Sequence, residues 1–167
     1  IKGWIQSHPV SRVIIAGAGF IGLEVAENLK ELGIQVAVVE MAPQIMAPFD
    51  PEMAAYLQQH LRQKGIHLYL GDGVKEFIDP GKGTIRVLLQ SGKAISADMV
   101  ILGIGIRAET QLAKNAGLEV GRGIIVNSFM QTSDPDIYAV GDAIEFPHLI
   151  SGQKAQIYLA GPANKQA

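Results

Sequence analysis

Residues 12–22 of this 167-residue chain have the sequence Arg-Val-Ile-Ile-Ala-Gly-Ala-Gly-Phe-Ile-Gly, and the expected architecture follows from them. The β-branched run Arg12–Ala16 predicts a buried strand. The segment Phe20–Leu32, which overlaps the end of the glycine-rich stretch, predicts a helix because its apolar side chains recur at helical spacing. The expected apolar face of that helix consists of Ile21, Val25, Leu29 and Leu32.

A G-x-G-x-x-G turn lies between the strand and the helix, and each of its glycines has its own physical reason. Gly17 permits the tight turn, Gly19 lets the backbone approach a pyrophosphate, and Gly22 lets the helix pack closely on the strand. The helix N-terminus adds free N–H groups and about half a positive charge, which attract phosphate. The alternative is a glycine-rich turn that binds nothing, but the strand-turn-helix context favours a dinucleotide site.

The following segments predict an α/β fold, namely a Rossmann-like parallel sheet with covering helices and a small antiparallel meander. Strands at Gln35–Glu40 and Ile66–Leu70 alternate with a helix that begins at Asp50-Pro51. Turn signals at 79–83 and 91–92 then separate short strands. The strands expected there are Val74–Ile78, Thr84–Leu89, Ala94–Ser96 and, buried again, Met99–Leu102. Beyond a boundary near Ile106–Thr110, the expected elements are a helix near Gln111–Ala116, strands near Ile124–Val126 and Ile137–Val140, and a helix within Gln153–Lys165.

An acidic residue ends the second predicted strand. Glu40 lies 18 residues beyond Gly22 (40 − 22), where a carboxylate accepts hydrogen bonds from the adenosine ribose hydroxyls. A 2′-phosphate there would face a like charge, so the sequence predicts that NADH is preferred over NADPH. The alternative is a solvated glutamate at a strand end.

The composition excludes several classes of function. The absence of cysteine excludes disulfides, thiolate catalysis and cysteine-ligated metals in this segment, and the four histidines show no metal-ligand spacing. A formal net charge of -2 argues against generic nucleic-acid or anionic-membrane binding. The longest strongly apolar run, Met99–Ile106, is far shorter than the ~20 residues that span a bilayer, and no signal-peptide pattern opens the chain. We therefore expect a cytoplasmic protein without a nucleic-acid or membrane partner.

Three stretches together resemble one family. They are Gly19–Glu27 (Gly-Phe-Ile-Gly-Leu-Glu-Val-Ala-Glu), Ile101–Thr110 (Ile-Leu-Gly-Ile-Gly-Ile-Arg-Ala-Glu-Thr) and Thr132–Ala143 (Thr-Ser-Asp-Pro-Asp-Ile-Tyr-Ala-Val-Gly-Asp-Ala). In this order they resemble the flavin-dependent pyridine nucleotide–disulfide oxidoreductases. Within that family the chain is most similar to the branch of coenzyme A-disulfide reductase, NADH oxidase and NADH peroxidase.

The resemblance implies a division of the chain into two parts. Residues 1–105 would be the NAD(H)-binding domain, and residues 106–167 the returning, partial segment of the FAD-binding domain. A first FAD segment would lie upstream and a dimerisation domain downstream, so we expect a fragment of a homodimeric parent. We also expect that the fragment alone is inactive and does not retain FAD.

The resemblance also assigns residues to the cofactors. Gly17, Gly19, Phe20, Ile21 and Gly22 would face the pyrophosphate and ribose of NADH. Glu24 would lie near the contact between nicotinamide and flavin, although a polar helix-face residue fits its spacing equally well. Gly103, Ile104 and Gly105 would line the nicotinamide side, or form only a strand-end turn. Asp142 would accept a hydrogen bond from the FAD ribitol, its alternative being a plain helix N-cap. No catalytic residue is expected within the chain.

The implied activity of the parent is transfer of hydride from NADH to FAD, and of electrons onward to a disulfide, peroxide or oxygen. The cofactors carry this chemistry and the protein orients them. A relative of ferredoxin or rubredoxin reductases, which pass electrons to a protein, is one alternative. The other is a non-catalytic NADH-binding module that senses redox state, which fold alone does not exclude.

Overall fold

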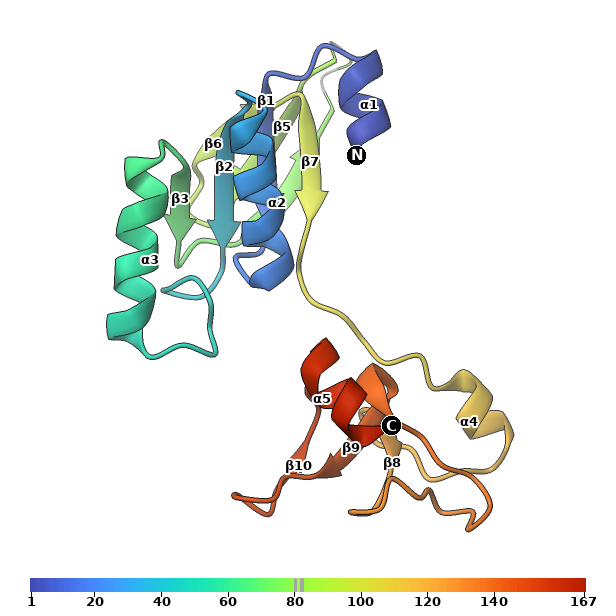
Figure 1. Ribbon diagram of the computed structural model, residues 1–167. Helices are drawn as coiled ribbons and strands as arrows, with labels where there is room; N and C mark the ends of the chain where they lie inside the picture. The colour runs from blue at the N-terminus through green and yellow to red at the C-terminus, as the bar shows by residue number, and fades with distance from the viewer. Residues whose placement is uncertain (80, 82) are drawn as a thin grey trace. The chain divides into compact units, whose positions relative to one another are not determined.

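The computed structural model describes residues 1–79, 81 and 83–167, and the chain divides into two compact units, Ile1–Gly105 and Ile106–Ala167 (Figure 1). The predicted turn at 79–83 includes Pro80 and Lys82, which lie outside the described residues. The elements of unit 1 are α1 (Lys2–Ser7), β1 (Arg12–Ala16), α2 (Phe20–Glu31), β2 (Gln35–Glu40), α3 (Pro51–Gln63), β3 (His67–Leu70), β4 (Val74–Ile78), β5 (Ile85–Leu89), β6 (Ala94–Ala97) and β7 (Met99–Leu102).

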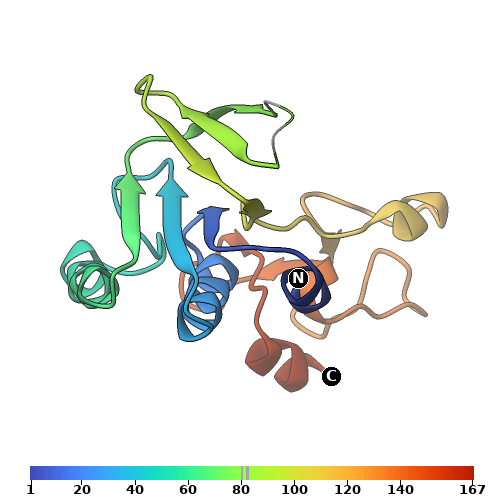
Figure 2. The same cartoon turned by 90° about the horizontal axis from the view of Figure 1, so that it is seen from above.

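Two sheets form unit 1. The strands β3, β2, β1 and β7 make a parallel sheet in that order, and β4, β5 and β6 make an antiparallel one. Helices α2 and α3 cover one face of the parallel sheet, and the meander lies on the other (Figure 2). The predicted α/β class, with its parallel sheet, covering helices and meander, is therefore confirmed.

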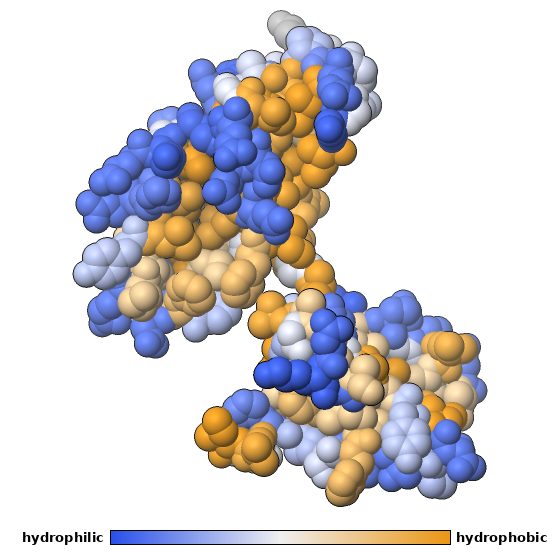
Figure 3. All heavy atoms as spheres, in the orientation of Figure 1, coloured by the Kyte–Doolittle hydropathy of each residue, from blue (hydrophilic) through white to orange (hydrophobic). Residues whose placement is uncertain are grey.

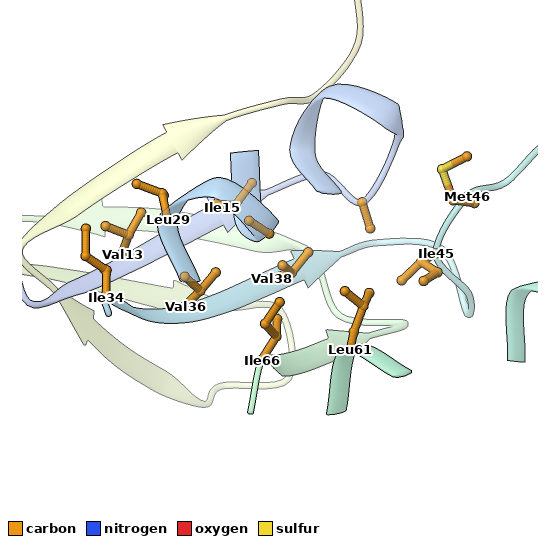
Figure 4. Packing of buried hydrophobic residues seen from close by; sticks show 12 residues of the cluster. Val13, Ile15, Leu29, Ile34, Val36, Val38, Ile45, Met46, Leu61 and Ile66 are labelled. Atoms are coloured by element: carbon orange, nitrogen blue, oxygen red, sulfur yellow. The ribbon is translucent and has the colours of Figure 1, made fainter. Parts of the chain in front are cut away.

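Alternation along β1 distributes its side chains between two cores. Val13 and Ile15 point toward the helices and belong to a cluster with Leu29 and Val38, as Figure 4 shows. Ile14, between them, packs instead with Val39 and with residues of the meander. Because both faces are covered, this strand is apolar from Val13 to Ala16 rather than alternating in polarity.

The apolar face predicted for α2 is partly wrong. Ile21 and Leu32 are 58% and 66% exposed, whereas Gly22, Ala26 and Leu29 are buried. The small residues Gly22 and Ala26 let the helix approach the sheet closely, so packing against β1 selects a face with less apolar surface than the sequence suggested.

Unit 2 contains α4 (Gln111–Asn115), β8 (Ile124–Ile125), η1 (Gly141–Ala143), β9 (Ile144–Pro147), β10 (Lys154–Ala155) and α5 (Ala160–Gln166). Strand β9 pairs in parallel with β8 and antiparallel with β10. Its Glu145 is buried, and the carboxylate accepts the Arg122 N–H at 2.7 Å. This bond fixes the turn that precedes β8.

The strand predicted at Ile137–Val140 does not form. The Asp134 carboxylate accepts the N–H of Asp136, and the Thr132 hydroxyl donates to the carbonyl of Ile137. Backbone pairing here is limited to an isolated antiparallel bridge between Tyr138 and Gln131, and the two side-chain bonds shape the turn between its two sides. Among the described residues, no helix combines the length and apolarity that crossing a membrane requires.

Asp98, between β6 and β7, ties the start of β1 to the sheet. Its carboxylate accepts the N–H and the hydroxyl of Ser11 and the N–H of Arg12, at 2.8–2.9 Å. Partial burial alone would raise the pKa of Asp98, but these hydrogen bonds and the Arg12 guanidinium outweigh it and hold the pKa below its ordinary value. The folded protein therefore favours the ionised carboxylate.

We expect Asp98→Asn to lower the free energy of unfolding at pH 7 by about 1–3 kcal/mol. A depressed folded-state pKa gives stability that is complete above the unfolded-state pKa of about 3.9 and lost as the pH falls through the folded value. Urea unfolding at pH 7 and pH 3 measures this loss. The free energies of unfolding of the Asn variant and of the unsubstituted chain should differ less at pH 3 than at pH 7. A difference of the same size at both values would contradict this role.

Candidate functional site

A groove of about 590 Å³ lies in unit 1 at the carboxyl ends of β1, β2 and β7. Strand β1 lies between β2, which follows it through α2, and β7, which returns from the meander. The chain therefore leaves β1 toward one side and comes back on the other, which makes this a topological switch point. Open α/β sheets bind ligands at such crevices.

The glycine turn is the part of this groove with the strictest steric demands. Gly17 has φ +104°, and a Cβ there would overlap the carbonyl oxygen of Gly103 and lie 2.7 Å from its carbon. A Cβ on Gly22 would overlap the carbonyl oxygen of Gly17. A Cβ on Gly19 would meet nothing within 4 Å. Two glycines are thus required by the fold, and the third leaves open space above the start of α2.

The start of α2 faces this open space. The first helical backbone bond runs from the Leu23 N–H to the Gly19 carbonyl at 3.0 Å. The N–H groups of a first helical turn lack acceptors inside the helix, and they carry the positive end of the helix dipole. The turn thus has the space, the donors and the charge that a pyrophosphate needs.

Glu40 lines the same groove and also holds its backbone. One carboxylate oxygen accepts the N–H of Ala18 and the other the N–H of Ala42, both at 2.8 Å. Each oxygen keeps a further lone pair, so ribose hydroxyls can still donate to it. The sequence indicated the ribose contact but not this second role, in which Glu40 fixes the glycine turn.

The structure brings together most of the residues predicted for the nucleotide, but not all. Those that line the groove are Gly17, Gly19, Phe20, Glu40, Gly103, Ile104 and Gly105. Gly22 is buried beneath the turn, and Ile21 is exposed on α2 outside the groove lining. Glu24 lines a different groove, described below. Asp142 is exposed on η1 of unit 2, where Gly141 has φ +79°.

Sequence reasoning missed one wall of the groove. The antiparallel meander contributes Gly73, Val74, Lys75, Phe77 and Gln90, and the β2–α3 connection contributes Ala47 and Pro48. Lys75 and Glu40 are the charged side chains among the lining residues. The register of β4 shifts between Val74 and Glu76, and the neighbours Val74 and Lys75 both line the groove, so simple alternation along this strand could not have marked them.

A second groove of about 590 Å³ lies between α2 and α3. Figure 3 shows apolar surface between the hydrophilic outer sides of these helices. Leu23, Leu57 and Leu61 are among its apolar lining residues, and Glu24, Glu27 and Lys64 are among the charged ones. Glu24 is exposed on α2 at this groove, and its contact with a nicotinamide stays a prediction.

The chemistry available in the first groove is recognition rather than covalent catalysis. In the described part of the chain, no three side chains of His, Asp or Glu gather as metal ligands. The groove offers a glycine turn, a helix N-terminus, one carboxylate and one ammonium group. Together, the topology and this groove have the features that dinucleotide-binding sites of Rossmann-type folds use.

Comparison with known proteins identifies the family of this chain. A model of the family described as pyridine nucleotide-disulphide oxidoreductase matches residues 2–167, and the chain belongs to this family. The resemblance drawn from the motifs is thus confirmed.

Three relatives illustrate the relationship. The NADH oxidase of Methanocaldococcus jannaschii is 42% identical over 156 residues, which cover 92% of this chain and 34% of that protein. The structure of reduced CoADR-RHD of Bacillus anthracis has a TM-score of 0.93 at 46% identity, and the match covers 99% of this chain and 30% of that one. The structure of a ferredoxin reductase from Rhodopseudomonas palustris has a TM-score of 0.89 at 34% identity, and the match covers 94% of this chain and 39% of that one. The chain thus spans about a third of the length of these relatives.

Proposed function

We propose that unit 1 binds NADH as part of a flavoprotein oxidoreductase. The observation that carries this proposal is the combination of an open Gly19 turn at the start of α2 with the Glu40 carboxylate in one groove. The glycine turn fits a pyrophosphate, and the carboxylate fits ribose hydroxyls while opposing a 2′-phosphate. The name of the Methanocaldococcus jannaschii relative, NADH oxidase, supports the same preference.

The residues of this chain bind and orient the nucleotide. The N–H groups at the start of α2 hold the pyrophosphate, and Glu40 accepts hydrogen bonds from the adenosine ribose. Gly103, Ile104 and Gly105, at the end of β7, line the part of the groove assigned to the nicotinamide side. When NADH and FAD are bound, they supply the hydride chemistry themselves.

Unit 2 is assigned in this proposal to the FAD-binding part of the parent protein. Asp142 is exposed on η1, beside a glycine in the left-handed region, so its carboxylate is free to accept a hydrogen bond from the FAD ribitol. Family membership supports a parent enzyme in which hydride passes from NADH to FAD. We further propose that the parent is a homodimer.

The electron acceptor has two candidates. The NADH oxidase and CoADR-RHD relatives favour onward transfer to oxygen, peroxide or a disulfide. The ferredoxin reductase relative favours transfer to a redox protein. Because this chain has no cysteine, a redox-active thiol for disulfide or peroxide chemistry would have to be supplied from outside these 167 residues.

Isothermal titration calorimetry of the purified chain with NADH and with NADPH tests the nucleotide proposal. We expect saturable binding of one NADH per chain and weaker binding of NADPH. Absence of NADH binding at millimolar concentration would overturn the proposal. Tighter binding of NADPH than of NADH would still support a nucleotide site, but it would contradict the role of Glu40 in opposing a 2′-phosphate.

A further inference from the structure

The connector between β2 and α3, residues 41–50, is partly buried although it lacks regular secondary structure. Ile45 and Met46 are 0% and 4% exposed. Figure 4 shows them at one end of the apolar cluster that also contains Val38 and Leu61. Connecting segments ordinarily run over the surface, so burial of this one indicates that the fold fixes its path.

Met46 has an unusual backbone conformation within this connector. Its φ of +49° lies in the left-handed region, which side-chain-bearing residues rarely adopt. In this conformation the Met46 N–H donates to the carbonyl of Ala18 at 2.9 Å. Ala18 is the residue between Gly17 and Gly19, so the strained position is bonded directly to the glycine turn.

The turn is consequently held from two directions. The Ala18 N–H donates to Glu40 and the Ala18 carbonyl accepts from Met46, so both backbone polar groups of this buried residue are fixed. The ring of Phe49 also meets that of Phe20, the first residue of α2, edge to face at 6.4 Å between centroids. The connector therefore contacts both the turn and the start of the helix.

We infer that Met46 is a positioning residue for the nucleotide site, acting through Ala18. This inference rests on the proposed function of the groove. Met46 is absent from the residues that line the nucleotide groove and lines the α2–α3 groove instead. Its left-handed conformation, rather than a contact with NADH, sets the place of the glycine turn and thereby the affinity for NADH.

A matched pair of substitutions separates conformation from packing. Met46→Leu and Met46→Ile introduce isomeric side chains of equal composition, but isoleucine is β-branched and tolerates a positive φ far less well. We expect the NADH dissociation constant to rise about tenfold in the Ile variant and less than about twofold in the Leu variant. Equal effects of the two substitutions would overturn the inference, because a role of the left-handed conformation requires the β-branched residue to be the worse of the two.

A third variant covers the case in which Met46→Ile does not fold. Met46→Gly permits the left-handed conformation and removes the side chain. We expect it to lower the midpoint of thermal unfolding while the NADH affinity of the folded protein stays within about threefold. Loss of affinity as large as the tenfold expected for isoleucine would overturn the inference.

Amide hydrogen exchange of the unsubstituted chain without ligand distinguishes failure of this inference from failure of the proposed function. In the unsubstituted chain the Met46 N–H should exchange as slowly as amides of the sheet. In the variants, the N–H of residue 46 should exchange faster with isoleucine than with leucine. If the chain does not bind NADH, the proposed function fails while exchange still reports on the Met46–Ala18 bond. A Met46 amide that exchanges at the rate of an exposed loop would overturn the inference directly.

Discussion

Gly17→Ala should unfold much of unit 1, whereas Gly19→Ala should leave the fold intact and weaken NADH binding. At position 17 a methyl group would overlap the Gly103 carbonyl, and φ is +104°. We expect a loss of at least about 3 kcal/mol in the free energy of unfolding, from backbone strain and steric overlap together. Urea unfolding followed by circular dichroism measures this loss.

Gly19→Ala is the matched control, because it adds the same methyl group two residues away. A Cβ at position 19 meets nothing within 4 Å, and φ is -80°. Stability should change by less than about 1 kcal/mol. The methyl group would occupy the space needed by the pyrophosphate, so NADH affinity should fall about tenfold or more. If Gly19→Ala binds NADH like the unsubstituted chain, the pyrophosphate does not approach this turn.

Glu40→Arg should reverse much of the discrimination against NADPH. The substitution removes a carboxylate that opposes the 2′-phosphate and adds a guanidinium that can bind it. We expect the NADPH affinity to rise relative to that for NADH by about 10- to 100-fold. The absolute NADH affinity should fall as well, because the N–H groups of Ala18 and Ala42 lose their acceptor. Parallel titrations with the two nucleotides give the ratio.

Glu40→Gln separates the two roles of this residue. It removes the negative charge without adding a positive one, and its single amide oxygen replaces only one of the two acceptors. We expect weaker binding of both nucleotides and a smaller change in their ratio than with arginine. An unchanged ratio in the arginine variant would remove Glu40 from the nucleotide site.

Local sequence signals predicted the strands and the glycine turn that border the groove. The strand Arg12–Ala16 and the strand Gln35–Glu40 form with the predicted bounds, because β-branched residues between glycine or proline signals leave few alternatives. The glycine spacing likewise located the turn, since backbone conformation and close approach both demand glycine there. These features depend on residues close together in the sequence.

Features that depend on distant partners were predicted poorly. Lys75 and Gln90 enter the groove wall only because β4 pairs with β5 and the meander covers the sheet. The Met46–Ala18 bond joins segments 28 residues apart (46 − 18), and nothing in the local pattern indicates a left-handed methionine. Pairing and strain of this kind are set by the whole fold, which a local pattern does not contain.

The most direct test of the account is to map NADH onto the ¹⁵N-labelled chain by nuclear magnetic resonance. We predict saturable shifts of the amides at 17–22, which form the glycine turn and the start of α2, and of Glu40 and Gly103–Gly105 at the ends of β2 and β7. Absence of saturable shifts at millimolar NADH would contradict the account. Shifts confined to the groove between α2 and α3 would also contradict it, because they would place the nucleotide away from the glycine turn.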